Sequence, residues 1–241
     1  MLKIDRTKIS HDKEISPDGD SAKIRYFENN QPLKAYALSS ELGKQCAGLQ
    51  LIIKDLEIVR ATLKLALTLS EKNNTSTTET YKKFNLENNE QLILASLVTS
   101  SIVTYAKYFT QGKGPAPFLN TDNVRKISNA DLLDYHEKIL DLRHTWVAHG
   151  GDNDLEIAKT IVVVDTKRKR SFDYFHHVHF STAPIVNDIE KFIDLTNNVL
   201  ILVKDMLQKR SQALWDKELS KLSVEEHDKK AGEDVLFSNR H

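Results

Sequence analysis

The stretch NADLLDYHEKILDLRHTWVAHGG, residues 129–151, predicts a helix from about Asn129 to His149, capped by Ser128 or Asn129 and ended by a Gly-Gly pair. Its apolar residues return at steps of three and four, as on one face of an α-helix. Successive residues of an α-helix are rotated by about 100° around its axis, and we count these angles from Ile139. The side chains in the arc between about −60° and +120° around the axis are mostly apolar. This arc is expected to face the core or a partner. It holds Leu132, Leu133, Tyr135, Leu140, Leu142, Trp146 and Val147.

Two basic side chains fall inside the apolar arc. Arg143 lies at about +40° and His136 at about +60°, while His149 lies at about −80°, just beside the arc. An isolated buried charge costs several kcal/mol, so Arg143 requires a partner. Either it pairs with a carboxylate from another helix, or the arc lines a groove or dimer seam where Arg143 meets an anion.

The segment LRHTWVAH, residues 142–149, resembles the signature of the HEPN superfamily, in which an Arg and a polar residue are followed after a short gap by a His. Five residues separate Arg143 from His149, and His144 takes the polar position after the Arg. The segment YAKYFTQGK, residues 105–113, also resembles the bacterial members. The resemblance covers roughly residues 33–210, including the order of two long helices, the motif helix and a closing helix.

This resemblance implies a metal-independent endoribonuclease without a cofactor, whose composite site lies at a two-fold dimer interface. Arg143 would bind the RNA phosphate, His149 would act as general base or acid, and His144 would orient the phosphate or His149. The implied setting is a toxin–antitoxin or abortive-infection system, with an antitoxin or other protein as partner. The alternative within the superfamily is a non-catalytic dimeric helical interaction module.

Helical periodicity also dominates the sequence around this segment. It predicts long helices over about residues 33–70, 88–111 and 184–222, and only 8 Gly and 5 Pro interrupt the 241 residues. Two runs of strand-forming residues, 160–165 and 172–180, flank the turn TKRKRS and predict a hairpin. The predicted fold is therefore an all-α, HEPN-like bundle of four to five helices with a small β-hairpin insertion.

The two ends of the chain carry weaker patterns than its middle. Residues 1–31 are polar and charge-balanced, which predicts a loose arm with a short strand near residues 24–27. Residues 216–241 predict a charged, mobile tail. The helical domain is expected between them, over residues 32–215, with its hairpin at about 160–180.

A basic run occupies the predicted hairpin turn. Lys167, Arg168, Lys169 and Arg170 either grip an RNA backbone or form a solvated turn. The whole chain has 34 basic and 34 acidic residues, which excludes a protein coated with positive charge for binding DNA. Any contact with nucleic acid therefore has to come from such a local patch.

Metal and membrane sites are not expected. His177 and His179 share one face of a predicted strand while His176 points the other way, and no companion ligand has the spacing of a zinc site. Cys46 is the only cysteine, which excludes an intrachain disulfide and favours a reducing compartment. The charged N-terminus lacks a signal segment, and the longest apolar stretch, residues 92–106, is too short and polar to span a bilayer. A cytoplasmic protein is expected.

Overall fold

The computed structural model describes residues 6–18, 21–72, 89–110, 117–147, 156–163, 173–180 and 188–238. The chain divides into two compact units. The first, the sheet unit, joins Met1–Cys46 to Lys209–His241, and the second, the helical unit, is Ala47–Gln208. The sheet unit is therefore built from both ends of the chain.

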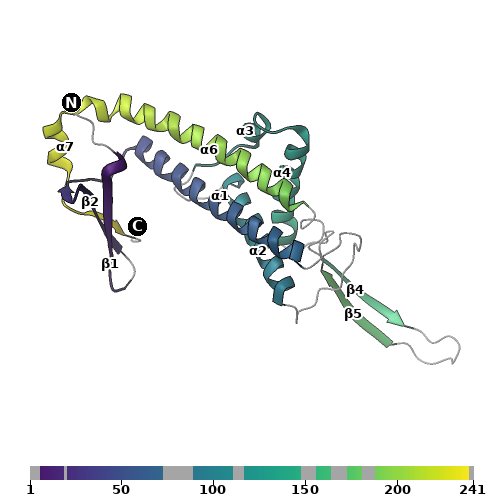
Figure 1. Cartoon of the computed structure of the whole chain (residues 1–241). Helices are drawn as coiled ribbons and strands as arrows, with labels where there is room; N and C mark the ends of the chain where they lie inside the picture. The colour runs from purple at the N-terminus through teal and green to yellow at the C-terminus, as the bar shows by residue number, and fades with distance from the viewer. Residues whose placement is uncertain are drawn as a thin grey trace. The chain divides into compact units, whose positions relative to one another are not determined.

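Helices make up most of the described part of the helical unit (Figure 1). The two longest, α1 (Glu41–Lys72) and α6 (Ile189–Lys217), each have one end in the sheet unit. Three described helices lie between them in sequence: α2 (Asn89–Ala106), followed by a 3-10 turn at Lys107–Phe109, then α3 (Thr121–Arg125), and then α4 (Ala130–Leu142), followed by a π-helical turn at Arg143–Val147. The antiparallel strands β4 (Glu156–Val163) and β5 (Asp173–Phe180) come between α4 and α6.

The core of the helical unit is apolar and is shared by α1, α2, α4 and α6. Apolar residues recur at helical spacing, so one face of each of these helices is buried. On α4 the buried residues are Tyr135, His136, Ile139 and Leu142, and all four lie in the predicted arc. Side chains with no exposed surface on the other three helices include Ile52, Leu56, Leu63, Val98, Ile102, Tyr105, Phe192 and Val199.

The sheet unit contains an antiparallel sheet in which β2 (Ser21–Glu28) is central. Along one edge, β2 pairs over its length with β1 (Ile9–Ile15). Along the other edge, β6 (Val235–Ser238) pairs with the first half of β2 and β3 (Gln31–Leu33) with its second half. The described part of the unit also includes α7 (Val224–Lys230) and 3-10 turns at Arg6–Lys8 and Leu219–Lys221.

Asn29 and Asn30 make the tight turn between β2 and β3. Both adopt positive φ, of 50° and 65°. A two-residue hairpin loop of type I′ requires positive φ at both central positions, and asparagine tolerates this conformation better than most residues. This Asn pair is therefore a local hairpin signal, which helical periodicity does not reveal.

Contacts in the sheet unit join the two ends of the chain. Ala35 and Gly232 exchange two backbone hydrogen bonds, of 2.9 and 3.0 Å. The guanidinium of Arg25 on β2 donates a 2.7 Å hydrogen bond to Asp234, directly before β6. The C-terminal segment is thus bound to the N-terminal strands.

The prediction of an all-α bundle of four to five helices is wrong, because the fold is mixed: in the described residues, six α-helices are accompanied by the antiparallel sheet of β1, β2, β3 and β6. β1 and β2 lie in the segment for which an arm is predicted, and β6 lies in the predicted tail. β3 spans the boundary between the predicted arm and the predicted helical domain. β1 reads ISHDKEI and is exposed at almost every position, so no alternation of apolar and polar residues marks it. Its structure depends on backbone pairing with β2, which its own sequence pattern does not show.

Several predicted elements are present with different limits. α1 begins at Glu41 instead of near residue 33, because residues 31–33 form β3. Asn129 is the N-cap of α4. The hairpin is present, with Glu156 opposite Phe180 at one end of the pairing of β4 and β5. The turn between these strands lies outside the described residues.

One stretch among the described residues, Asn89–Phe109, is long and apolar enough to cross a membrane by length and composition. Half of the most apolar part of this stretch is buried in the protein, and Val98, Ile102 and Tyr105 have no exposed surface. The core helix of a soluble protein meets the same criteria. The length and composition of α2 therefore do not by themselves indicate a membrane span.

Candidate functional site

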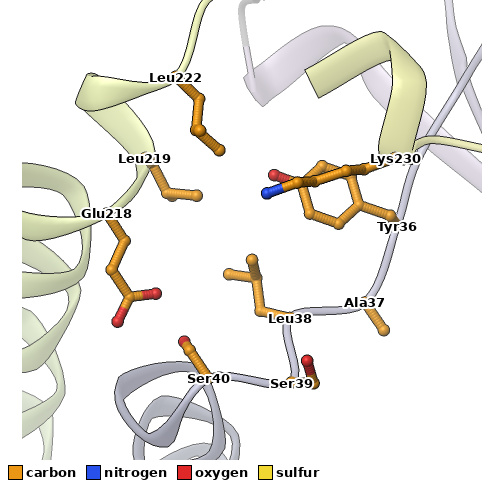
Figure 2. Close-up of a pocket in the computed structure, with 9 residues that line it drawn as sticks. All are labelled: Tyr36, Ala37, Leu38, Ser39, Ser40, Glu218, Leu219, Leu222 and Lys230. Carbon is orange, nitrogen blue, oxygen red and sulfur yellow. The ribbon is translucent and has the colours of Figure 1, made fainter. Parts of the chain in front are cut away.

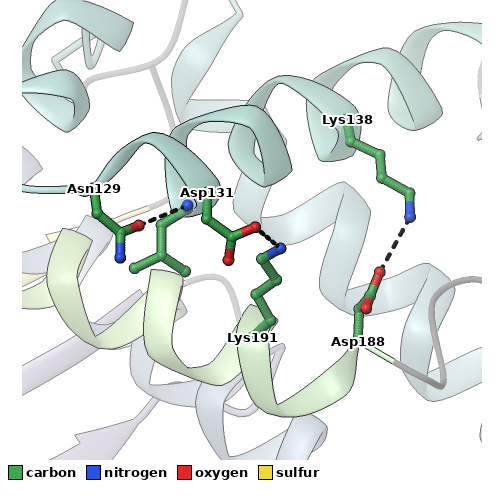
Figure 3. Close-up of polar contacts among 6 residues, drawn as sticks. Asn129, Asp131, Lys138, Asp188 and Lys191 are labelled. Atoms are coloured by element: carbon green, nitrogen blue, oxygen red, sulfur yellow. Dashed lines mark hydrogen bonds and ion pairs between the residues drawn. The ribbon is translucent and has the colours of Figure 1, made fainter.

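α4 begins at a side-chain cap and leads to Arg143 at its other end. The side-chain oxygen of Asn129 accepts a 2.9 Å hydrogen bond from the backbone N–H of Leu132 (Figure 3). This bond satisfies one of the amide groups that the first turn of a helix leaves without a partner. The cap thereby defines where the helix starts.

Replacing Asn129 with alanine is expected to destabilise the protein by about 1 kcal/mol, because the Leu132 amide loses its acceptor. Glu137, which is exposed on the same helix, provides the control. Glu137→Ala is expected to change the free energy of unfolding by less than about 0.5 kcal/mol. Urea unfolding of both variants measures the difference, and equal midpoints would show that the cap contributes nothing.

Two ion pairs connect α4 to the start of α6 (Figure 3). Asp131 pairs with Lys191, and Lys138 pairs with Asp188 at 3.2 Å. The ammonium groups of Lys191 and Lys138 also lie 5.5 and 5.6 Å from the centre of the Tyr135 ring. Burial raises the pKa of Tyr135 well above its usual range, so its hydroxyl stays protonated. Ion pairs at exposed sites contribute little to stability, so the packing of the buried Tyr135 ring against Phe192 of α6 contributes more to the contact between the two helices.

The helix widens directly after Leu142. Residues Arg143–Val147 form a π-helical turn, in which hydrogen bonds span five residues instead of four. Arg143 is the C-cap of α4, and its backbone N–H donates to the carbonyls of Ile139 and Leu140. Single π turns in α-helices occur frequently at functional sites. The widening also means that angles calculated for an α-helix do not apply beyond Arg143.

Arg143 is half-buried, and its side chain lies beside that of His144. Nη1 of Arg143 is 3.3 Å from Nδ1 of His144, which is exposed. Within the described ranges, no carboxylate lies at ion-pair distance from the Arg143 guanidinium. The first of the two alternatives for Arg143, a carboxylate from another helix, is therefore not found among the described residues, and the guanidinium can donate to an anion.

The remaining predicted site residues lie in parts of the chain that the structure does not describe. His149, the predicted base or acid, lies outside the described residues, as do the basic turn residues Lys167, Arg168, Lys169 and Arg170. Arg143 and His144 are thus the two predicted site residues whose contact is established.

The histidines of β5 lie on a paired strand. His176, His177 and His179 are opposite Thr160, Lys159 and Ile157 of β4. In the part of the chain that the structure describes, no three His, Cys, Asp or Glu side chains are grouped so that they could hold a metal ion.

His136, the second basic residue of the apolar arc, is completely buried. Its Nδ1 lies 2.8 Å from the Tyr105 hydroxyl and its Nε2 lies 3.3 Å from the Thr121 hydroxyl. The ring of Phe109 packs edge-on against it, with centres 4.6 Å apart. Burial lowers the pKa of His136 to about 4, so the imidazole is neutral at pH 7. His136 is a hydrogen-bonded core residue and is not placed for chemistry on a substrate.

A polar cluster that sequence reasoning missed joins α1 to the turn after α2. The Asp55 carboxylate accepts a 2.5 Å hydrogen bond from the Tyr108 hydroxyl and pairs with Lys107. Burial raises the pKa of Asp55, but the hydrogen bonds from Lys107 and Tyr108 outweigh this effect and leave the pKa below its usual value. The one feature of the sequence that could have indicated this cluster is the position of the acidic Asp55 directly before Leu56, which is buried. Lys107 and Tyr108 both hold the Asp55 carboxylate in place, so the cluster is structural.

A pocket of about 560 Å³ lies in the sheet unit, between the segment before α1 and the segment after α6 (Figure 2). Leu38, Leu219 and Leu222 provide apolar walls. Glu218 and Lys230 add one carboxylate and one ammonium group to its lining. None of the predicted site residues lines this pocket.

Comparison with protein-family models, with curated proteins and with solved structures finds no match for this chain.

Proposed function

We propose that this protein is a metal-independent endoribonuclease that cuts RNA by attack of the 2′-hydroxyl, with Arg143 as its phosphate-binding residue. The observation that supports this proposal is that Arg143 is half-buried in a π-helical turn and has no carboxylate partner among the described residues. A guanidinium in such a place gains most from an anion that accepts its planar set of donors. The RNA phosphodiester is an anion of that kind.

In the proposed reaction, a base removes the proton of the 2′-hydroxyl, and the oxygen attacks the neighbouring phosphorus. The bond to the 5′-oxygen of the next nucleotide breaks, and that oxygen leaves with a proton from an acid. Arg143 stabilises the additional negative charge of the phosphorane. His149 is proposed as the base or the acid because imidazole titrates near neutrality, and His144 is proposed to orient the phosphate.

The partners and the setting belong to the same proposal. Two copies would form the composite site through the motif helix, which is α4 with the π-helical turn that follows it. Lys167, Arg168, Lys169 and Arg170 would hold the RNA backbone. The proposed setting is a cytoplasmic toxin–antitoxin or abortive-infection system with an antitoxin as partner. A second candidate function is a non-catalytic dimeric helical interaction module. It is favoured by the exposed apolar side chains Leu51, Ile58 and Leu65 on α1.

Arg143→Ala and His149→Ala are each expected to slow the cleavage of single-stranded RNA by about a hundredfold or more. The assay contains EDTA, and the products are expected to carry 2′,3′-cyclic phosphate and 5′-hydroxyl ends. Because Arg143 is only half-buried, the thermal midpoint of Arg143→Ala should stay within a few degrees of the unmodified protein.

Arg125→Ala is the matched control. Arg125 is an exposed arginine on α3 that pairs with Asp122 at 2.8 Å, so its loss should leave cleavage unchanged. The variants purified in parallel also report any contaminating nuclease, which would cut equally in all samples. Absence of cleavage by the unmodified protein, a requirement for a divalent cation, or full activity of Arg143→Ala would contradict the proposal.

A further inference from the structure

A second stripe of side chains on α1 faces away from the core of the helical unit. Its members follow one another at steps of three and four, the a and d spacing of a coiled coil, and every one of them is exposed. The three large apolar members, Leu51, Ile58 and Leu65, are 43%, 49% and 51% exposed and recur every seventh residue. The stripe consists of Leu51, Lys54, Ile58, Ala61, Leu65 and Thr68.

This stripe is additional to the face that α1 already buries. The buried face is formed by other residues of the same helix, among them Ile52, Leu56 and Leu63, which have no exposed surface. A helix that packs on one side only usually carries charged residues on its opposite side. α1 instead carries only one charged residue, Lys54, at the six stripe positions, so a second helix can pack there.

The charges beside the stripe select an orientation for two copies of this helix. In a parallel pair, the two Lys54 side chains would face each other across the seam, and like charges repel. In an antiparallel pair centred between Ile58 and Ala61, Lys54 faces Leu65 of the second copy instead, where its alkyl stem can pack and its ammonium can reach water.

The flanking residues complement one another in the same antiparallel arrangement. Glu57 and Lys64 both lie at the position before a large apolar residue of the stripe, and both are exposed. Antiparallel pairing brings Glu57 opposite Lys64 of the second copy, twice by symmetry. Glu57 also accepts a 3.2 Å hydrogen bond from Lys204 of its own chain, and it keeps a side chain that is 45% exposed for a second cation.

We propose that the stripe Leu51–Lys54–Ile58–Ala61–Leu65–Thr68 is the docking surface for a second copy of this chain, which binds antiparallel along α1. The occupant is a second copy because the charge pattern of α1 is complementary to itself in one orientation only. This surface lies on α1 and not on the motif helix, so the proposal does not depend on ribonuclease activity.

Disulfide cross-linking tests the orientation. In a Cys46→Ser background, antiparallel pairing places Leu51→Cys opposite Thr68→Cys of the second copy, so a mixture of the two single variants should form a covalent dimer under mild oxidation. Neither variant alone should do so, because its two thiols would be about 25 Å apart at 1.5 Å per residue. Cross-linking of Leu51→Cys alone would show a parallel pair and overturn the proposal.

Measurements of size in solution test the surface itself. The unmodified chain is expected to associate through α1 at micromolar concentration, in addition to any pairing through the motif helix. Ile58→Glu should weaken the association through α1 by about a hundredfold or more, because it buries an unpaired charge. Glu57→Lys or Lys64→Glu alone should weaken it roughly tenfold, and the double exchange should restore it. All these positions are exposed, so far-ultraviolet circular dichroism should be unchanged. A monomer at high micromolar concentration, or an oligomeric state that Ile58→Glu leaves unchanged, would overturn the proposal.

Discussion

Acidification from pH 7 to pH 4 is expected to remove on the order of 3 kcal/mol of stability from the helical unit through one side chain, His136. Burial lowers the pKa of His136 to about 4 in the folded protein, from 6.5 in an exposed histidine. Below about pH 6.5 the unfolded chain therefore binds a proton that the folded chain does not. The contribution is fully present above pH 6.5 and is lost as the pH falls towards 4.

Urea unfolding at a series of pH values measures this effect, with His136→Gln as the reference. Glutamine can still form hydrogen bonds near Tyr105 and Thr121, but it does not titrate. The free-energy difference between the two proteins should shrink as the pH falls from 6.5 to 4. Asp55 contributes at more acidic pH, because hydrogen bonds from Lys107 and Tyr108 outweigh the effect of burial and hold its pKa below the usual value of an aspartate. A difference that stays constant with pH would show that His136 does not resist protonation.

Phe192→Ala is expected to destabilise the helical unit by about 4 kcal/mol. Phe192 has no exposed surface. Its ring packs edge-on against Tyr105 of α2 at 5.4 Å and against Tyr135 of α4 at 6.0 Å. Removing the ring leaves a cavity where three helices meet, and these rigid aromatic neighbours cannot readily fill it.

Ile201→Ala provides the matched control on the same helix. Ile201 is 67% exposed, so its truncation should change the free energy of unfolding by less than about 0.5 kcal/mol. Chemical unfolding of both variants gives the comparison. If Phe192→Ala destabilised the protein no more than Ile201→Ala, α6 would not be part of the core as the structure places it.

The helix over residues 129–149 shows what periodicity can predict. Burial of Tyr135, Ile139 and Leu142 follows from spacing alone, since an α-helix has one face for residues three and four apart. The cap at Asn129 is equally local. The burial of His136 is predicted by the same arithmetic, but its bonds to Tyr105 and Thr121 are not, because they come from distant parts of the chain.

Residue spacing does not predict the sheet or the π-helical turn, and the reasons differ. β1 is a polar edge strand whose order depends on β2, so its own residues carry no alternating pattern. The π turn at Arg143–Val147 is a change in hydrogen bonding within a helix, and residue spacing assumes a constant pitch. For the candidate site, the sequence predicts that Arg143 needs a partner, while the structure adds its neighbour His144.

The pairing of β2 with β6 also determines the order in which the two units can finish folding during synthesis on the ribosome. Roughly 200 residues separate these strands, so at 5–20 residues per second about 10 to 40 s pass between their synthesis. During that interval the edge of β2 from Ser21 to Ile24 has no strand to pair with. The helical unit, by contrast, is continuous from Ala47 to Gln208 and is finished earlier. β2, one of the first strands to be translated, is thus among the last to obtain all of its neighbours.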